Sequence, residues 1–477
     1  MLRYKIKDII KDSSIYGFSK VLGQIVSFFL IPLYTSYLTL ENYGILNIIG
    51  LFSGSLSLLM NFGIDSATYR FVGMNKDDGE IQKEYIGNSQ ILSIFSILFF
   101  TVITLIFLQP LNKFALSTAS PLFFLIVGIG NGIFTSISAI PRAYLRINRK
   151  VKVIAISTLI NVFGSIASTL IFVVVLKYGI LGALLGNLVG TLLSTIYITK
   201  YTPKFTFKIF NRKKSNELIK YCLPTLPTQI FAFAIPLYSQ WSVKQYLSFN
   251  DLGLYAIGLK FTLPLIVGLS MFQQSYAPYK YQIIKTDENP QDTFSKIMNV
   301  FIIVFGFSVL LVSFFGGDIL KMMTAEEYHS AAKNVFYIAL IPFAQGLYFM
   351  FSSGLEFTKN PIYRPIISGA GLLTVLLTNH WLIKHFGIPG APISIVLSWL
   401  VMAIGNLVYA QKLYKINYNW ILIVGVSMFI FGIGYYINDV WNVSLFQKIA
   451  LTISILVITI YFINNKYNLK QFLQFKK

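Results

Sequence analysis

The chain has 477 residues, of which 55% are hydrophobic and 12% are charged, about half the charged fraction of an ordinary soluble protein. Its mean hydropathy is +0.66 and its formal net charge is +21. A water-soluble chain of this length could not bury so much apolar surface, so the composition excludes a soluble globule and indicates a protein embedded in lipid.

Uncharged stretches that are long enough to cross a bilayer recur from one end of the chain to the other. A helix needs about 20 predominantly apolar residues for this, and about 14 windows meet the need. We therefore predict an all-α membrane protein with about 14 transmembrane helices, with 12 or 13 left open by the shorter windows. The windows start near residues 13, 41, 88, 118, 153, 179, 218, 252, 296, 333, 363, 388, 418 and 446.

The positive charge is distributed unevenly between the segments that connect these windows. With the N-terminus inside, 30 of the 39 Lys and Arg residues fall on cytoplasmic segments and 7 on outer ones, while Lys20 and Lys260 fall within spans. This asymmetry is the positive-inside rule, and it predicts both termini in the cytoplasm. The charged opening MLRYKIKDIIKDSS leads straight into a span, which favours a retained first helix over a cleaved signal. The rule explains the basicity, so we expect no nucleic-acid partner.

Two short motifs recur about 200 residues apart. IPLY occupies Ile31–Tyr34 and Ile235–Tyr238, and a Gly-x-x-Gly-Ala pattern begins at Gly179 and again at Gly387. The two offsets, 204 and 208 residues, are nearly equal and the motifs keep their order. This favours a duplication of six helices.

The duplication predicts three domains. They are a first lobe with helices 1–6 at residues 1–209, a second lobe with helices 7–12 at 210–412, and helices 13–14 with a basic tail at 413–477. An even number of crossings gives both lobes the same orientation, as in transporters built from parallel repeats. Such a pair of lobes is suited to alternating access.

Signatures of soluble catalytic domains are missing from the sequence. No G-x-x-x-x-G-K-[ST] motif occurs, so we expect no direct use of ATP. The single cysteine and three histidines lack metal-ligand spacing, so we expect neither a metal site nor a cofactor. Membrane lipids are the expected surroundings.

Several predicted helices carry polar residues along one face at spacings of three or four. Ser, Thr and Gly on such a face can simply let helices pack closely in lipid, but the combined stripes on helices 1, 2 and 7 favour a water-filled cavity. Helix 4 carries a comparable stripe. The stripes include Lys20 and Gln24 in helix 1, Asn47, Gly54, Ser57 and Asn61 in helix 2, Asn131, Thr135, Ser138 and Arg142 in helix 4, and Thr228 and Gln229 in helix 7.

Two lysines lie near mid-membrane depth in the predicted spans. A lysine at a helix centre costs about 2.5–3.5 kcal/mol on insertion scales, so Lys20 and Lys260 are expected to face a cavity or a partner. Snorkelling of the side chain to the interface is the alternative. The functional reading is a cationic site for an anionic substrate.

Four further charged residues lie in or next to spans. Asp65, Arg70 and Arg142 are near cytoplasmic helix ends, where a structural ion pair or an interfacial position competes with a binding role. Glu356 is the one carboxylate placed clearly within a predicted span. It is therefore a candidate for proton or sodium coupling.

The sequence resembles a known group of membrane proteins. The opening DSSIYGFSKVLGQIVSFFLIPLYTSYLTLENYGIL, followed by NFGIDSATYRFV, is similar to the start of polysaccharide-unit (O-antigen or capsule, Wzx-type) flippases of the multidrug/oligosaccharidyl-lipid/polysaccharide (MOP) exporter superfamily. NDLGLYAIGLKFTLPL and the KYGILGALLG segment resemble the same family. The resemblance implies two pseudo-symmetric six-helix bundles of the MATE type with two further C-terminal helices.

The resemblance also implies a cargo and a set of site residues. The cargo is an undecaprenyl-pyrophosphate-linked oligosaccharide, moved from the cytoplasmic to the outer leaflet of a bacterial inner membrane, with H⁺ or Na⁺ as the coupling ion and polysaccharide polymerase machinery as a partner. On this basis Lys20, Lys260, Arg142 and Arg70 are expected to bind the pyrophosphate, Gln24, Asn61 and Gln229 the sugars, and Glu356 and Asp65 the coupling ion.

Two other functions remain open at this point. A MATE-like drug/cation antiporter would need carboxylates at mid-membrane depth, where this chain has lysines. A membrane polysaccharide polymerase or ligase would need a large outer loop, and the longest outer stretch, Gly316–Lys333, is short.

Overall fold

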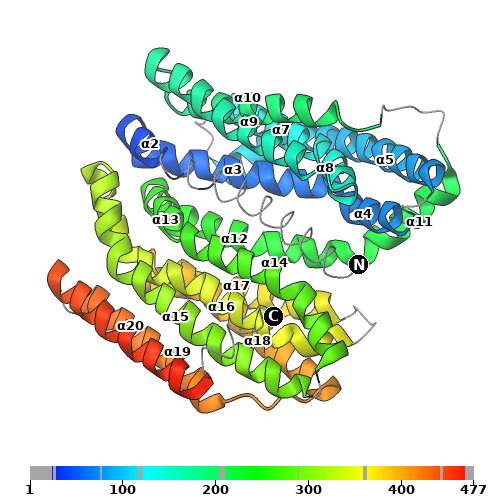
Figure 1. Ribbon diagram of the computed structural model, residues 1–477. Helices are drawn as coiled ribbons and strands as arrows, with labels where there is room; N and C mark the ends of the chain where they lie inside the picture. The colour runs from blue at the N-terminus through cyan, green and yellow to red at the C-terminus, as the bar shows by residue number, and fades with distance from the viewer. Residues whose placement is uncertain are drawn as a thin grey trace. The chain divides into compact units, whose positions relative to one another are not determined.

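The computed structural model describes residues 24, 28, 30–75, 78–116, 121–203, 210–287, 289–357, 363–440 and 444–467. Every regular element in these ranges is a helix (Figure 1). The predicted all-α class is therefore confirmed.

Ten of the described helices are long and apolar enough to cross a membrane, and 12 if each of two bent pairs is a single span. The bent pairs are Arg212–Cys222 with Leu226–Tyr246, at 47°, and Phe249–Phe261 with Leu263–Tyr276, at 48°. Leu445–Val457 is a shorter apolar helix. Each falls on a window predicted from the sequence. The window that starts near residue 13 lies mostly outside the described residues, so the total of 14 stays a prediction.

The chain divides into two compact units, Met1–Trp241 and Ser242–Lys477. The division falls inside a helix, about 30 residues beyond the end predicted for the first lobe. The predicted lobes at 1–209, 210–412 and 413–477 stay a prediction.

In the first unit, long apolar helices are joined by short ones (Figure 1). The elements are α2 (Ile31–Tyr37), α3 (Leu40–Asn61), α4 (Ile64–Met74), α5 (Gly79–Ile106), α6 (Leu108–Ala115), α7 (Leu122–Ile137), α8 (Ala139–Ile147), α9 (Val151–Thr169) with a π-helical end (Leu170–Val175), α10 (Gly179–Thr199), α11 (Arg212–Cys222), a 3₁₀ turn (Leu223–Thr225) and α12 (Leu226–Tyr246), in which the division falls.

In the second unit, α15, α16 and α19 enclose a core rich in buried aromatic rings, among them Phe301, Phe336 and Phe351. The elements are α13 (Phe249–Phe261), α14 (Leu263–Thr286), α15 (Pro290–Met323), a 3₁₀ helix (Glu326–Asn334), α16 (Val335–Phe351), a 3₁₀ helix (Ser352–Phe357), α17 (Tyr363–Phe386), α18 (Gly390–Leu413), α19 (Trp420–Tyr435) with a π-helical end (Tyr436–Val440), and α20 (Leu445–Tyr467).

Helices α9 and α10 approach each other closely along their length. Gly182, Gly186 and Gly190 recur every four residues on α10 and are buried. A Cβ atom at Gly186 would lie 2.8 Å from the backbone nitrogen of Thr169 on α9, and one at Gly190 would lie 2.5 Å from the backbone oxygen of Asn161. This is the small-residue spacing with which helices bring their backbones together in lipid.

The repeated glycine motif has the same structural role in both units. Gly179 and Gly387 have φ values of +54° and +65°, a left-handed backbone conformation that residues other than glycine rarely adopt. Three residues after each, Gly182 and Gly390 lie so close to the backbone of the preceding helix that a Cβ atom would collide with it. The matched sequence therefore marks a matched helix–turn–helix geometry.

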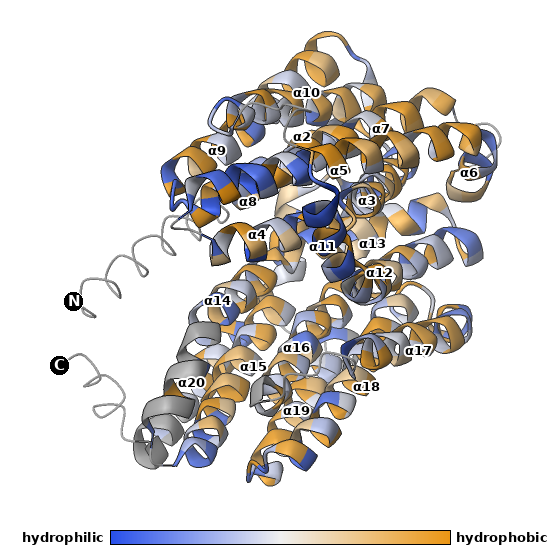
Figure 2. Ribbon diagram, turned by 90° about the vertical axis from the view of Figure 1, so that its right-hand side faces the viewer, coloured by the Kyte–Doolittle hydropathy of each residue, from blue (hydrophilic) through white to orange (hydrophobic). Residues whose placement is uncertain are grey.

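Hydrogen bonds to α5 hold the polar helix α11, which Figure 2 shows in hydrophilic colours. Asn88 Oδ1 accepts hydrogen bonds from the backbone nitrogen of Asn211 at 2.8 Å and from Ser215 Oγ at 2.9 Å. Tyr85 donates to Glu217 Oε2 at 2.6 Å. These bonds explain why the residues just after 209 belong to the first compact unit.

Replacing Asn88 with alanine is expected to release α11. Asn88 is fully buried, so its loss leaves the Ser215 hydroxyl and the Asn211 N–H without their acceptor, at about 1–3 kcal/mol for each unpaired group. We expect a lower melting temperature and faster amide hydrogen exchange in α11. Asn148→Ala is the control, because the Asn148 side chain donates to the backbone oxygen of Tyr144 in its own turn and has no other hydrogen-bond partner among the described residues. Equal exchange in the two variants would contradict this role.

Candidate functional site

The first unit contains a polar cavity of about 1050 Å³. Its walls come from α3, α4 and α7 to α10, with one residue each from α11 and α12. The polar side chains that line it are Ser57, Asn61, Asp65, Ser66, Tyr69, Arg70, Asn131, Thr135, Ser138, Arg142, Arg146, Thr158, Asn161, Thr191, Tyr221 and Gln229.

The α3–α4 wall is shaped by a left-handed step in the backbone. Gly54, Ser57 and Asn61 follow one face of α3, and α3 then ends at Phe62 and Gly63, whose φ values are +53° and +72°. Successive left-handed residues end a helix and redirect the chain. Because α4 starts immediately afterwards, its polar residues line the same cavity as the stripe on α3.

Helices α7 and α8 supply the second wall and pack directly on α3 and α4. A Cβ atom at Gly132 would lie 3.2 Å from the backbone oxygen of Ser53, and Ser136 Oγ lies 3.0 Å from Ser57 Oγ. These close contacts fix the register of α7 against α3. The α7 stripe continues into α8 and ends with Arg142 and Arg146, one turn apart.

Helices α9 and α10 complete the inner part of the cavity. Asn161 Nδ2 donates to Thr191 Oγ1 at 3.3 Å, and the Thr191 hydroxyl donates to the backbone oxygen of Asn187 at 2.9 Å. Thr158 lines the cavity one turn before Asn161. This wall offers amide and hydroxyl groups and no charge among its described lining residues.

The cavity has a net positive charge. Its described lining contains three arginines and one carboxylate, Asp65. Asp65 Oδ1 accepts a hydrogen bond from the Ser66 backbone nitrogen at 2.7 Å, and Arg70 lies over the Tyr221 ring at 4.8 Å from its centroid. The half-buried Arg142 keeps its Nε without a hydrogen-bond partner among the described residues. These cations are therefore able to bind an anionic ligand.

The cavity gathers five of the nine residues predicted as site residues from the sequence. They are Asn61, Asp65, Arg70, Arg142 and Gln229. That they lie together is a structural finding, whereas their individual roles stay predictions.

Of the other four predicted site residues, Gln24 and Lys260 do not line this cavity. Lys20 is outside the described residues. Gln24 is partly buried, with no described partner for its Oε1. Lys260 is in the second unit, in the last turn of α13 next to the 48° bend. The backbone of Glu356 lies in the 3₁₀ helix after α16, and its side chain is outside the described part of the chain.

Several residues that line the cavity were not predicted from the sequence. Arg146 counted only as a cytoplasmic charge, although its position four residues after Arg142 puts it on the same helix face. Asn161 and Thr191 lie on helices rich in Ser, Thr and Gly, a composition equally typical of close packing. No sequence signal pairs Tyr221 with Arg70, because α11 and α4 meet only in the folded unit.

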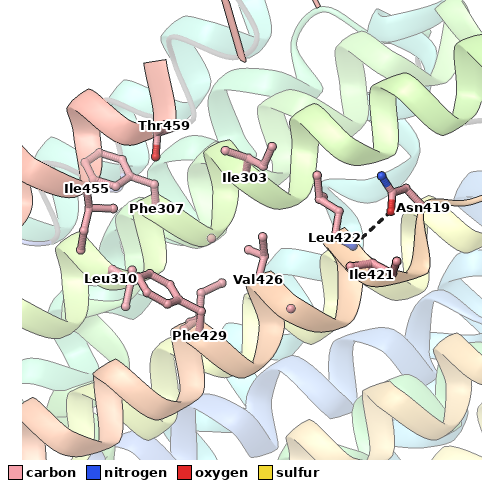
Figure 3. Close-up of a pocket in the computed structure, with 13 residues that line it drawn as sticks. Ile303, Phe307, Leu310, Asn419, Ile421, Leu422, Val426, Phe429, Ile455 and Thr459 are labelled. Atoms are coloured by element: carbon pink, nitrogen blue, oxygen red, sulfur yellow. Dashed lines mark hydrogen bonds between the residues drawn. The ribbon is translucent and has the colours of Figure 1, made fainter. Parts of the chain in front are cut away.

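A second cavity, of about 470 Å³, lies in the second unit between α15, α19 and α20. Figure 3 shows Phe307, Leu310 and Phe429 lining it, with Asn419 at one edge accepting a hydrogen bond from the Leu422 backbone nitrogen at 3.2 Å. The described lining is apolar apart from Asn419 and Thr459. It offers no charge to a polar ligand, so the cavity of the first unit is the candidate site.

Comparison with known proteins now identifies the family. The family described as "Polysaccharide biosynthesis protein" matches residues 9–284, more than half of the chain. The chain belongs to this family. No curated protein matches it.

Three solved structures that the chain resembles are two transporters and a flippase. Lipid II flippase MurJ, in an inward closed conformation, has 17% identity and a TM-score of 0.69, over 94% of this chain and 98% of its own. An inward-facing multidrug resistance MATE family transporter of the MOP superfamily has 14% identity and a TM-score of 0.66, over 85% of this chain and 96% of its own. A MOP superfamily transporter from Pyrococcus furiosus, described as having a binding pocket of reverse polarity, has 15% identity and a TM-score of 0.61. The match covers 85% of this chain and 95% of the transporter.

At these identities the likeness is one of fold. It confirms the MATE-like fold predicted from the sequence, and the family match confirms the predicted resemblance to polysaccharide biosynthesis proteins. The chain is therefore a member of the polysaccharide biosynthesis family with many membrane-spanning helices, and it shares its fold with transporters and a flippase.

Proposed function

We propose that this protein translocates undecaprenyl-pyrophosphate-linked oligosaccharide units from the cytoplasmic to the outer leaflet of a bacterial inner membrane, by alternating access. The observation that carries the proposal is the cavity of the first unit, where Arg70, Arg142 and Arg146 share the lining with amides, hydroxyls and the rings of Tyr69 and Tyr221. Guanidinium groups form paired, charge-assisted hydrogen bonds with phosphate oxygens. Amides, hydroxyls and aromatic rings are suited to sugars.

The family and the fold support this cargo. The family is described as one of polysaccharide biosynthesis proteins, and the similar MurJ is a lipid II flippase. Both termini in the cytoplasm follow from the positive-inside distribution of Lys and Arg. A coupled H⁺ or Na⁺ belongs to the proposal, with Asp65 and Glu356 as the candidate residues, and so does the polysaccharide polymerase machinery as a partner.

A drug/cation antiporter is the second candidate, because MATE transporters share the fold. The charge of the cavity argues against it. A cationic drug would meet three arginines and one carboxylate whose oxygen already accepts a hydrogen bond. A polymerase or ligase has less support, since neither family nor fold points to it.

Reconstitution of the full chain tests the proposed function. Vesicles that contain the protein are expected to move labelled undecaprenyl-pyrophosphate oligosaccharide from one leaflet to the other. Lys20→Ala and Lys260→Ala are each expected to slow movement about 10- to 150-fold if the ammonium group bonds to pyrophosphate, because hydrogen bonds to charged groups contribute about 1.5–3 kcal/mol. If the double variant moves the lipid at the normal rate, these two lysines do not bind the pyrophosphate, and the proposed flippase function still stands.

Failure of the function itself has a separate signature. Vesicles that do not move the lipid-linked oligosaccharide but extrude cationic dyes would overturn the flippase proposal in favour of the antiporter. Vesicles that contain protein unfolded by heat are the control for leakage.

A further inference from the structure

Charged and uncharged polar groups occupy different ends of the cavity in the first unit. All four charged lining residues among the described ones are on α4 and α8, which follow the ends of the long helices. The lining of α7, α9 and α10 has no charge and consists of Asn131, Thr135, Thr158, Asn161 and Thr191 with apolar or backbone surface. The cavity therefore has a cationic end and an amide–hydroxyl end.

The two ends differ in depth along the helices. At 1.5 Å per residue, Asn131 is about 22 Å from Arg146 along α7 and α8. By the same measure, Asn161 is about 15 Å from the start of α9 at Val151, and Thr191 is about 12 Å from the end of α10 at Thr199. The cationic end thus lies at the ends of the spans, near the lipid headgroups, and the amide–hydroxyl end lies towards their middle.

The inner end offers an acceptor that has no partner among the described residues. Asn131 keeps a buried Oδ1 without a hydrogen bond to any of them. A buried amide oxygen without a donor is unfavourable, so a donor from a ligand or from water is expected there. A sugar hydroxyl can donate to this oxygen, whereas a carboxylate or sulfate would be repelled by it.

The lipid part of the cargo restricts which group can reach this depth. When the cargo is loaded, the polyprenyl chain is in hydrocarbon and its pyrophosphate is near the headgroups, at the level of Arg70, Arg142 and Arg146. Only the sugar beyond the pyrophosphate can fold inwards from there. The cavity exceeds the approximately 300–1,000 Å³ of ordinary small-molecule sites, so it has room for more than a pyrophosphate.

Building on the proposed function, we propose that the inner end of this cavity, formed by Asn131, Asn161 and Thr191, is a subsite for uncharged sugar. The cargo enters sugar first, and on entry its pyrophosphate is bound by the arginines at the outer edge of the cavity. An acidic sugar next to the pyrophosphate is disfavoured, since the described lining at this depth offers it no cation.

Binding measurements on the full-length protein test the subsite with two probes. These are undecaprenyl pyrophosphate that carries a neutral disaccharide and sugar-free undecaprenyl pyrophosphate. Asn131→Leu removes the amide oxygen at similar size. It is expected to weaken binding of the glycosylated lipid about tenfold, because one hydrogen bond is lost and a sugar hydroxyl is left unpaired. Binding of the sugar-free lipid is expected to stay unchanged. Thr199→Val is the matched control, because Thr199 is on α10 outside the cavity and donates to Thr195 of its own helix.

Charge reversal gives a second, independent measurement. The wild-type protein is expected to bind a lipid pyrophosphate that carries a uronic acid at least about tenfold more weakly than the neutral disaccharide lipid. Asn131→Lys supplies a cation at this depth and is expected to reverse that preference. This gain of binding cannot result from misfolding.

The outcomes separate this inference from the proposed function. If Asn131→Leu weakens both lipids equally or neither, or if the uronic acid lipid binds as well as the neutral one, the sugar subsite is wrong while the flippase function stands. If the folded wild-type protein binds neither lipid pyrophosphate, the proposed function falls, and the subsite with it.

Discussion

Replacement of Arg142 by glutamine is expected to slow translocation of a lipid-linked oligosaccharide about 10- to 150-fold, which corresponds to the loss of roughly 1.5–3 kcal/mol for hydrogen bonds to a charged group. Arg142 is the half-buried arginine of the cavity, and its Nε has no hydrogen-bond partner among the described residues. A guanidinium group in this position is able to form a hydrogen bond with an anionic ligand. We therefore expect its removal to cost more than removal of Arg146, which is exposed.

The comparison with Arg146→Gln gives this prediction its control. Both substitutions remove one positive charge from the same face of α8, but surrounding water screens Arg146 more strongly. Raising the salt concentration should weaken the Arg146 contribution and affect the Arg142 contribution less. Initial rates of translocation in vesicles at low and high salt measure both effects. If Arg142→Gln and the wild-type protein translocate the lipid at equal rates, Arg142 does not bind the cargo.

Alanine at Gly190 or Gly390 is expected to destabilise its unit by about 3 kcal/mol or more, at the upper end of the cost of overpacking. A Cβ atom at Gly190 would collide with the side chain of Ser165 and lie 2.6 Å from its backbone nitrogen. One at Gly390 would collide with the carbonyl of Leu382 and lie 2.5 Å from the nitrogen of Ile383. Backbone atoms cannot rotate away, so the helices must separate.

Matched glycine substitutions in the same units test whether close packing is the cause. Gly50 on α3 and Gly432 on α19 have no atom within 4 Å of an added Cβ. Alanine there is expected to leave the melting temperature unchanged or slightly higher, because alanine favours a helix by about 1 kcal/mol over glycine. Melting of the four variants in detergent, followed by tryptophan fluorescence, measures the difference. If Gly190→Ala and Gly50→Ala have the same melting temperature, the close approach of α9 and α10 is not important for stability.

Much of the fold could be predicted from the sequence, because lipid imposes simple rules. A span must be apolar and about 20 residues long, and each described span falls on such a window. The pairing of Gly179 with Gly387 could also be predicted, since a left-handed turn favours glycine wherever it recurs. The position of α11 could not, because it depends on bonds between Asn88 and Ser215, which are 127 residues apart.

The candidate site was predictable only in part. Asn61 and Arg142 stand out because polar residues at helical spacing are unusual in a lipid-facing stretch. The step at Phe62, with φ of +53°, could not be predicted, since phenylalanine rarely adopts this conformation. That step directs Asp65 and Arg70 to the same cavity as Asn61. Asn161 and Thr191 come together through the packing of α9 on α10, which a sequence pattern alone does not distinguish from ordinary small-residue contacts.

The glycine ladder of α10 also bears on how the cavity can open. The backbones of α9, with its π-helical end, and α10 touch at Gly182, Gly186 and Gly190. The two helices cannot slide or rotate past each other without a backbone collision, so we expect them to move as one rigid unit. Asn161 and Thr191 are on these two helices, so the spacing between their side chains is expected to be the same in every conformation of the first unit.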